Sequence, residues 1–132
     1  MMTEKKEMLL SYIKANVAPI LVDFLEGKDL DQGTIIESDI DINELSGHYE
    51  GTEYKPPKWL KELEENKTKL LVIDKIDKIS IEEQKKFVEI LKYKKVSTFN
   101  LPKECVILLT AKEINKETVS EEILSLVAMI KK

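Results

Sequence analysis

The chain has 132 residues, of which 42% are hydrophobic and 35% charged, and its formal net charge is -4. This composition predicts one soluble globular domain, residues 1–132, and excludes an intrinsically disordered chain. The acidic balance argues against general nucleic-acid binding, and because all 21 basic residues are lysines, no arginine is present for bidentate phosphate contacts or an arginine finger.

The compartment is also indicated by composition. Cys105 is the only cysteine, which rules out an internal disulfide and fits a reducing environment. The first residues, MMTEKKEM, lack the apolar stretch of a signal peptide, and the apolar run at 17–22 is too short to cross a membrane. We therefore expect a cytoplasmic protein that is not membrane-bound.

The N-terminal part predicts one helix and leaves one segment ambiguous. Residues 4–15 place Met8, Leu9, Tyr12 and Ile13 at helical spacing, as in an amphipathic helix. The following segment, 17–26, has two interpretations. It is either a short buried strand followed by a loop, or a second helix that begins near Pro19 and ends at Gly27.

The middle of the chain predicts two strands and a helix. Residues 34–37, TIIE, are typical of a short strand, and the polar segment after it carries no clear periodicity. Pro56-Pro57 precedes a helix that ends near Asn66. Residues 69–74 predict the clearest strand, because the run between Lys69 and Asp74 is continuously apolar, which is typical of a strand covered on both faces.

The C-terminal half continues this alternation. Ser80 is a good N-cap, with Glu83 completing a capping box, for a helix with an apolar stripe of Ile81, Phe87, Val88 and Leu91. A second buried strand is expected at 105–110, a short helix capped by Ser120 after it, and a last strand at 127–130. Strands that alternate with helices predict an α/β fold, with a mainly parallel sheet flanked by helices.

Several motifs in this order resemble the core of a MoxR-type AAA+ ATPase. PPKWL precedes the strand LLVID; a helix follows with Gln84 and Leu91 in an E-x-Q-x6-L pattern; and Leu101-Pro102 precedes the strand CVILLT. The upstream DINELSG is similar to a D-x-x-(D/E)-L-x-G segment of that family. The resemblance spans roughly residues 34–112 and implies a reduced P-loop NTPase-like three-layer core without the helical lid domain.

The phosphate-binding loop that this family needs is degenerate. A P-loop has the pattern G-x-x-x-x-G-K-[ST], because bare backbone N–H groups wrap the phosphates and the hydroxyl binds magnesium. In the candidate segment 22–29, Gly27 and Lys28 are in place, but Val22 replaces the first glycine and Asp29 replaces the hydroxyl. Acidic residues beside this loop would also repel phosphate.

The catalytic positions implied by the resemblance are altered too. Asp74 matches the magnesium-binding acid, but Lys75 stands where the catalytic acid belongs and, while charged, cannot accept a proton from water. Thr110 matches the sensor 1 position, and Leu126 stands where an arginine finger would be. Gly27, Lys28, Asp74 and Thr110 are therefore the candidate, vestigial nucleotide-binding residues, and no catalytic residue is expected.

Two functions follow as hypotheses. The first is a catalytically inactive AAA+-like domain, a pseudoenzyme that acts as a structural or protein-interaction module without a cofactor; its partner would be an AAA+ subunit or a second copy of the chain. The alternative is a protein that binds ATP or ADP with magnesium but does not hydrolyse it efficiently. A position of Gly27 and Lys28 beside Asp74 would favour the alternative.

Four other features receive structural interpretations. The lone His48 has no cysteine nearby, which argues against a metal site, and Cys105 is expected to be an inert core residue. Trp59 is expected to pack its own helix, with an exposed partner-binding patch as the alternative. The acidic residues Glu37, Asp39 and Asp41 suggest a solvated loop rather than a cation site.

Overall fold

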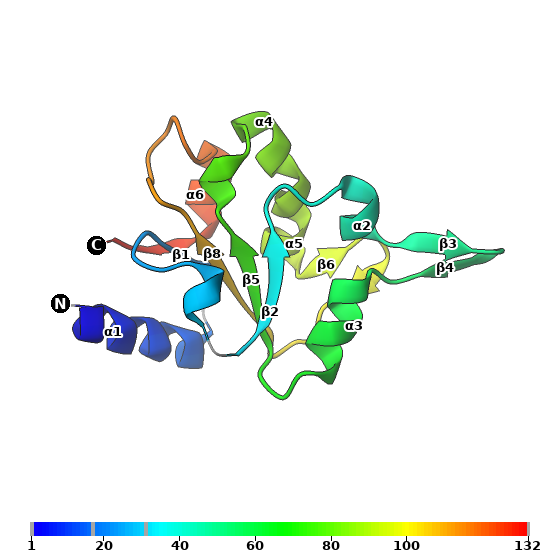
Figure 1. The fold of residues 1–132 in the computed structure, drawn as a ribbon, viewed down its shortest axis with the longest axis horizontal. Coiled ribbons are helices and arrows are strands. Elements are labelled where there is room, and N and C mark those ends of the chain that lie inside the picture. Colours follow the sequence, from blue (N-terminus) through cyan, green and yellow to red (C-terminus); the bar gives the residue numbers. More distant parts are fainter. Residues whose placement is uncertain (1, 17, 31, 132) are drawn as a thin grey trace.

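The protein is built around a central sheet of five parallel strands (Figure 1). The computed structural model describes residues 2–16, 18–30 and 32–131. The spatial order is β2-β5-β8-β1-β9. Helices lie against both faces, which makes a Rossmann-like three-layer α/β fold and confirms the predicted fold class at that level. The strands are β1 (Ile20–Val22), β2 (Thr34–Glu37), β5 (Leu70–Asp74), β8 (Val106–Thr110) and β9 (Ala128–Ile130).

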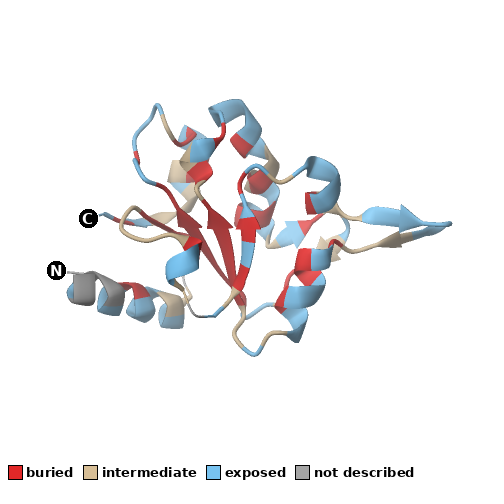
Figure 2. Cartoon of the chain, viewed as in Figure 1, coloured by how far each residue is buried: buried red, intermediate tan, exposed pale blue. Residues whose placement is uncertain are grey.

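The apolar content of each strand follows its place in the sheet. Every residue of the central strands β1, β5 and β8 is buried, as their continuous apolar runs require. The edge strand β2 alternates between buried and exposed residues instead, with Ile36 buried and Ile35 exposed. Figure 2 shows this contrast between the centre of the sheet and its edge.

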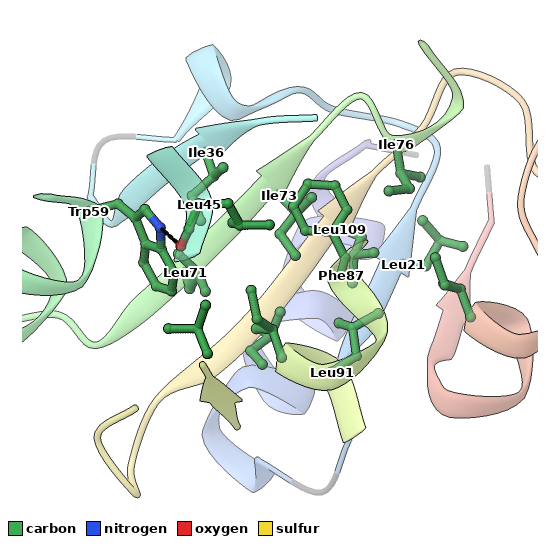
Figure 3. Close-up of a cluster of buried hydrophobic side chains, with 14 of the residues drawn as sticks. Leu21, Ile36, Leu45, Trp59, Leu71, Ile73, Ile76, Phe87, Leu91 and Leu109 are labelled. Carbon is green, nitrogen blue, oxygen red and sulfur yellow. Dashed lines mark hydrogen bonds between the residues drawn. The ribbon is translucent and has the colours of Figure 1, made fainter. Parts of the chain in front are cut away.

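One face of the sheet carries the larger core and most of the helices. Trp59 and Leu63 on α3 and Phe87 and Leu91 near α5 pack with Ile73 and its neighbours in one hydrophobic cluster (Figure 3). The helices are α3 (Lys58–Glu65), α4 (Ile81–Gln84), α5 (Val88–Tyr93) and α6 (Glu121–Leu126). Ser80 and Ser120 cap α4 and α6 by accepting hydrogen bonds from backbone N–H groups, as predicted.

The opposite face is covered by α1 (Met2–Ala15), which contributes Leu9 to a second cluster with the central strands. The apolar side of this helix is narrower than predicted, since Met8 and Tyr12 are 45% and 44% exposed. Ile13 is partly buried. Among the described residues, no helix is long and apolar enough to cross a membrane.

The helix predicted after Ser80 is not continuous. A 3-10 turn, η3 (Lys85–Phe87), separates α4 from α5, but Phe87 and Leu91 are buried and Val88 packs against the core, as predicted. Ile81 is 36% exposed, whereas Ile90 is fully buried. The prediction that Ile81 belongs to the apolar stripe was therefore wrong, because this residue lies at the exposed first position of α4.

The ambiguous segment 17–26 resolves as the strand interpretation. Ile20–Val22 forms β1, so the helical alternative was wrong; Val17 lies outside the described residues. After β1 the chain makes only a loop and a 3-10 turn, η1 (Gly27–Asp29), before it reaches β2. The full-length helix that would normally connect two parallel strands is replaced by this short connection.

The polar segment before Pro56 contains structure that the sequence did not predict. It forms α2 (Ile42–Ser46) and a projecting hairpin of β3 (His48–Glu50) and β4 (Glu53–Lys55), largely exposed in Figure 2. A second small hairpin consists of β6 (Lys95–Val96) and β7 (Phe99–Asn100). The Tyr54 ring stacks on Phe99, with centroids 5.5 Å apart, and connects the two hairpins.

Candidate functional site

The topology of the sheet marks one place where a ligand would bind. From β1 the chain continues to β2 at one edge, whereas from the neighbouring strand β8 it continues to β9 at the other edge. Adjacent strands whose connections leave in opposite directions create a crevice at their carboxyl ends, where open α/β sheets bind ligands. A hollow of about 560 Å³ lies there, and residues that follow β1, β5 and β8 line it.

Three of the four predicted site residues meet at this position, which we call the strand-end site: Gly27, Asp74 and Thr110. The Gly27 N–H and the Thr110 hydroxyl both donate to Asp74 Oδ1, each at 2.7 Å. Asp74 is only 4% exposed. Its carboxylate therefore fixes the loop after β1 to the ends of β5 and β8.

Gly27 is required by this close approach. A Cβ atom at position 27 would lie 3.2 Å from Asp74 Cγ and 3.3 Å from each carboxylate oxygen, which is too tight without a local shift. The glycine at the place of the second P-loop glycine thus brings the backbone against a carboxylate of the protein itself.

Several backbone N–H groups of the loop are already used by neighbouring groups. The Glu26 N–H donates to Asp29 Oδ2 at 2.8 Å and the Gly27 N–H donates to Asp74. The next turn is closed by the Asp29 and Leu30 N–H groups, which donate to the carbonyls of Glu26 and Gly27. A phosphate cradle needs free backbone donors, and here two of the loop's N–H groups donate to carboxylates of the protein itself.

The lysine at the expected catalytic position contributes its backbone. The Lys75 N–H donates to Thr110 Oγ1 at 2.8 Å, and the Lys75 carbonyl accepts from the Ser38 hydroxyl at 2.6 Å. Lys75 adopts the left-handed conformation, with φ of 57°, as the chain turns into η2 (Ile76–Lys78). These hydrogen bonds of Lys75 are thus made by its backbone and not by its side chain.

The charges around the hollow are balanced. Its lining includes four lysines and four acidic residues. Lys28, the fourth predicted site residue, is on the rim and pairs with Glu26, with Nζ 3.4 Å from the carboxylate. The structure therefore places Lys28 at the hollow but not in contact with Asp74. The lysines are Lys28, Lys75, Lys78 and Lys112; the acids are Asp23, Glu26, Asp29 and Asp77.

Two further residues hold the site together and were not identified as functional from sequence. The Asp77 carboxylate accepts from the backbone N–H groups of Lys112 and Glu113, which fixes the loop after β8. The buried Gln84 amide donates to three carbonyls and accepts from the Ser120 N–H at 2.8 Å. The only sequence signal for Gln84 was the E-x-Q pattern of the resemblance.

The remaining sequence candidates have structural roles. Trp59 is 6% exposed and its indole N–H donates to the Leu45 carbonyl (Figure 3), so the packing interpretation is confirmed and the exposed patch was wrong. Cys105 is buried, and this burial raises the pKa of its thiol to about 11, which keeps it protonated and unreactive. His48 is exposed on the hairpin, and its Nε2 lies 3.3 Å from Glu50 Oε1.

The three acids after β2 do not converge on one point. Asp41 caps α2 by accepting from the Asn43 N–H, and Asp39 pairs with Lys78 at 3.0 Å. The hydrogen bond and charge of Lys78 lower the pKa of Asp39, and Asp39 raises that of Lys78. Over the described residues, no three His, Cys, Asp or Glu side chains are grouped as a metal site would require.

Magnesium nucleotide does not fit the strand-end site as it stands. Asp74 Oδ1 already accepts two hydrogen bonds, and the loop that would surround a phosphate is closed by Asp29 and Asp74. A bound nucleotide would have to displace both carboxylates from their donors. No protein-family model matches the chain, and no curated protein matches it significantly.

Proposed function

We propose that the protein is a catalytically inactive, reduced AAA+-like domain that serves as a protein-interaction module. The observation that carries this proposal is that Asp74 Oδ1 accepts hydrogen bonds from both the Gly27 N–H and the Thr110 hydroxyl. The residue that would hold magnesium in an ATPase of this kind instead connects three segments of the fold. Its role here is stability, and the surfaces of the domain remain for binding a partner.

The rest of the site agrees with a loss of catalysis. The acid that would activate water is replaced by Lys75, whose N–H and carbonyl make the local contacts. The helix that would follow a phosphate loop is reduced to the 3-10 turn Gly27–Asp29. An exposed hairpin and a largely exposed α2 are added beyond the sheet, and such projecting elements suit protein contacts.

The second candidate function is nucleotide binding without efficient hydrolysis. It is favoured by the position of Gly27 directly against Asp74, and by a hollow of about 560 Å³ with lysines on its rim at the switch point of the sheet. It requires the Glu26 and Gly27 N–H groups to be released from the two carboxylates. We rank it second for that reason.

Calorimetric titration with MgATP and MgADP decides between the two functions. We expect no saturable heat at high micromolar protein concentration, because the donors that would hold phosphate are occupied. The matched variant is Asp74→Asn, whose amide oxygen can still accept from Gly27 and Thr110 but carries no charge for magnesium. Saturable, magnesium-dependent binding that disappears in Asp74→Asn would contradict the proposal and support the second candidate.

A further inference from the structure

The outer side of β2 is open for another strand. The Ser38 N–H donates to the Asp74 carbonyl, so the alternation of the pleat turns the backbone of Ile36 toward β5 and that of Ile35 and Glu37 outward. The Glu37 carbonyl accepts from the Ile40 N–H. The N–H and carbonyl of Ile35 and the N–H of Glu37 are therefore directed away from the sheet.

A groove runs along this edge, between β2, α2 and α3. Two hollows of about 610 and 470 Å³ share Ile35, Ile40, Glu44 and Trp59 in their linings, so they form one continuous depression, which we call the β2 edge groove. Ile35 is 43% exposed, an unusual position for an isoleucine in a parallel sheet. The groove thus combines an open backbone edge with apolar surface.

The charge of the groove is strongly one-sided. Five acidic side chains line it against one lysine, Lys58. Asp39 is paired with Lys78 and Asp41 caps α2, but the other three acids form no ion pair with another described residue. The acids are Glu37, Asp39, Asp41, Glu44 and Glu62.

We infer that the β2 edge groove binds an extended segment of a partner protein in which lysine or arginine alternates with apolar residues, and that this segment adds to β2 as a further strand. Main-chain hydrogen bonds to Ile35 and Glu37 would supply affinity, and the acids would select the basic side chains. This inference rests on the proposed interaction function and names its surface and partner chemistry.

A second copy of the chain is a poor occupant of the same edge. Pairing β2 with β2 of another molecule would bring two acidic β2 edge grooves next to each other, and like charges brought together across an interface are destabilising. Acidic residues on an edge strand also prevent uncontrolled sheet extension. The acidic charges of the groove therefore disfavour self-association through β2 and favour binding of a basic strand.

The first test is calorimetric titration of the whole protein with the acetylated, amidated peptide KVKIKVK. We expect saturable binding that weakens with added salt, and none of the glutamate counterpart EVEIEVE. The double variant Glu44→Gln/Glu62→Gln should bind about tenfold more weakly, since two charge pairs are lost. The matched control Glu64→Gln/Glu65→Gln changes two exposed acids of the same helix region outside the groove and should bind as the wild type does.

The second test asks whether the backbone takes part. Ile35→Pro removes an outward N–H without removing a bond between β2 and β5, as edge strands allow, and should abolish binding while circular dichroism stays unchanged. If this variant does not fold, two N-methylated peptides answer the same question. One peptide is methylated on the backbone nitrogens of its lysines, and the other on the backbone nitrogens of its apolar residues. These two sets of N–H groups lie on opposite edges of the peptide strand, so one peptide should bind and the other should not.

The outcomes are separable from those of the nucleotide experiment. The inference would be overturned if KVKIKVK did not bind, or if both peptides or both N-methylated forms bound equally well. It would also be overturned if sedimentation showed concentration-dependent dimerisation through β2. None of these results depends on the strand-end site. Nucleotide binding would contradict the proposed loss of catalytic-site function but would leave a peptide result at the groove intact.

Discussion

Glu37 and Asp74 end two neighbouring strands and are paired in register, but they lie in opposite environments. Asp74 is 4% exposed and its carboxylate accepts hydrogen bonds from two segments distant in sequence. Glu37 is exposed and forms no ion pair with another described residue. One acid is part of the internal structure, and the other belongs to a surface.

The difference indicates which part of the molecule remains available for binding. At the strand-end site, donors and acceptors are matched within the protein, so a ligand would have to break existing hydrogen bonds. At the β2 edge groove, backbone groups and carboxylates face solvent and can pair with a partner at little internal cost. At the hollow where an open α/β sheet usually binds its ligand, Asp74 is engaged in hydrogen bonds within the protein, whereas backbone groups at the edge of the sheet are not.

Removal of the two carboxylates should separate these roles most clearly. Asp74→Ala leaves the Gly27 N–H and the Thr110 hydroxyl without their acceptor, and we expect the free energy of unfolding to fall by about 3 kcal/mol. Glu37→Ala should change it by less than about 0.5 kcal/mol, as is usual for an exposed residue. Urea denaturation with unchanged m-values measures both effects.

Asp74→Asn is the control for charge at the same position. Its amide oxygen can accept both hydrogen bonds, so it should lose about 1 kcal/mol or less, well short of the alanine variant. A loss as large as that of Asp74→Ala would mean that the negative charge, and not the acceptor, stabilises the site. Equal stability of Asp74→Ala and Glu37→Ala would contradict the structural role of Asp74.

A smaller effect is expected at Thr110, the partner of Asp74 on β8. Thr110→Val preserves the shape of the side chain but removes the hydroxyl that donates to Asp74 and accepts from the Lys75 N–H. We expect a loss of about 1–2 kcal/mol in the same denaturation experiment. The exposed Thr52→Val should be nearly neutral. Wild-type stability in Thr110→Val would show that Thr110 is only a strand-end residue.

The sheet could be predicted from sequence because its central strands are buried on both faces. The runs at 70–73 and 106–109 are continuously apolar, and no exposed strand or amphipathic helix has that pattern. Ser80 and Ser120 marked helix starts through local hydrogen bonding, which depends only on near neighbours. These signals are contained within a few residues, so one sequence suffices to recognise them.

The segment 38–55 could not be assigned in the same way. Its hairpin is mostly exposed, with Tyr49 72% exposed, so no alternation of apolar and polar residues marks the strands. Two local signals were present: Asp41 as an N-cap of α2, and Gly51, whose φ of 66° allows the hairpin turn. Both are weak without the neighbouring structure.

The candidate site was predicted as a group of residues but not as a network. The spacing of the motifs indicated Gly27, Asp74 and Thr110, and the structure brings these three together. The hydrogen bond from the Gly27 N–H to Asp74 could not be foreseen, because it depends on how residues 47 apart in the sequence approach each other. Sequence patterns identify which groups are present, whereas their hydrogen-bond partners follow from tertiary packing.

The smallest expected effect concerns Asp39 and Lys78, an exposed pair beside the β2 edge groove. Lys78 lowers the pKa of Asp39 in the folded protein. The pair's contribution to the free energy of unfolding is therefore present above the usual aspartate pKa and is lost as the pH falls through the pKa of Asp39 in the folded protein. Asp39 raises the pKa of Lys78, so the corresponding contribution is lost as the pH rises through that value. Lys78→Met should move the Asp39 pKa, measured by NMR titration, back up toward that of an ordinary aspartate.

The same Lys78→Met variant should leave the thermal midpoint nearly unchanged, because exposed ion pairs are screened by water and salt. Lys28→Met, which removes a lysine that pairs with Glu26, is the matched control and should not move the Asp39 pKa. An unchanged Asp39 pKa in Lys78→Met would mean that the pair does not form in solution. Asp39 would then be free of Lys78 in the wild type as well, and KVKIKVK should bind the wild type and Lys78→Met equally well. If the pair does form, Lys78→Met frees Asp39 and should strengthen binding of this peptide.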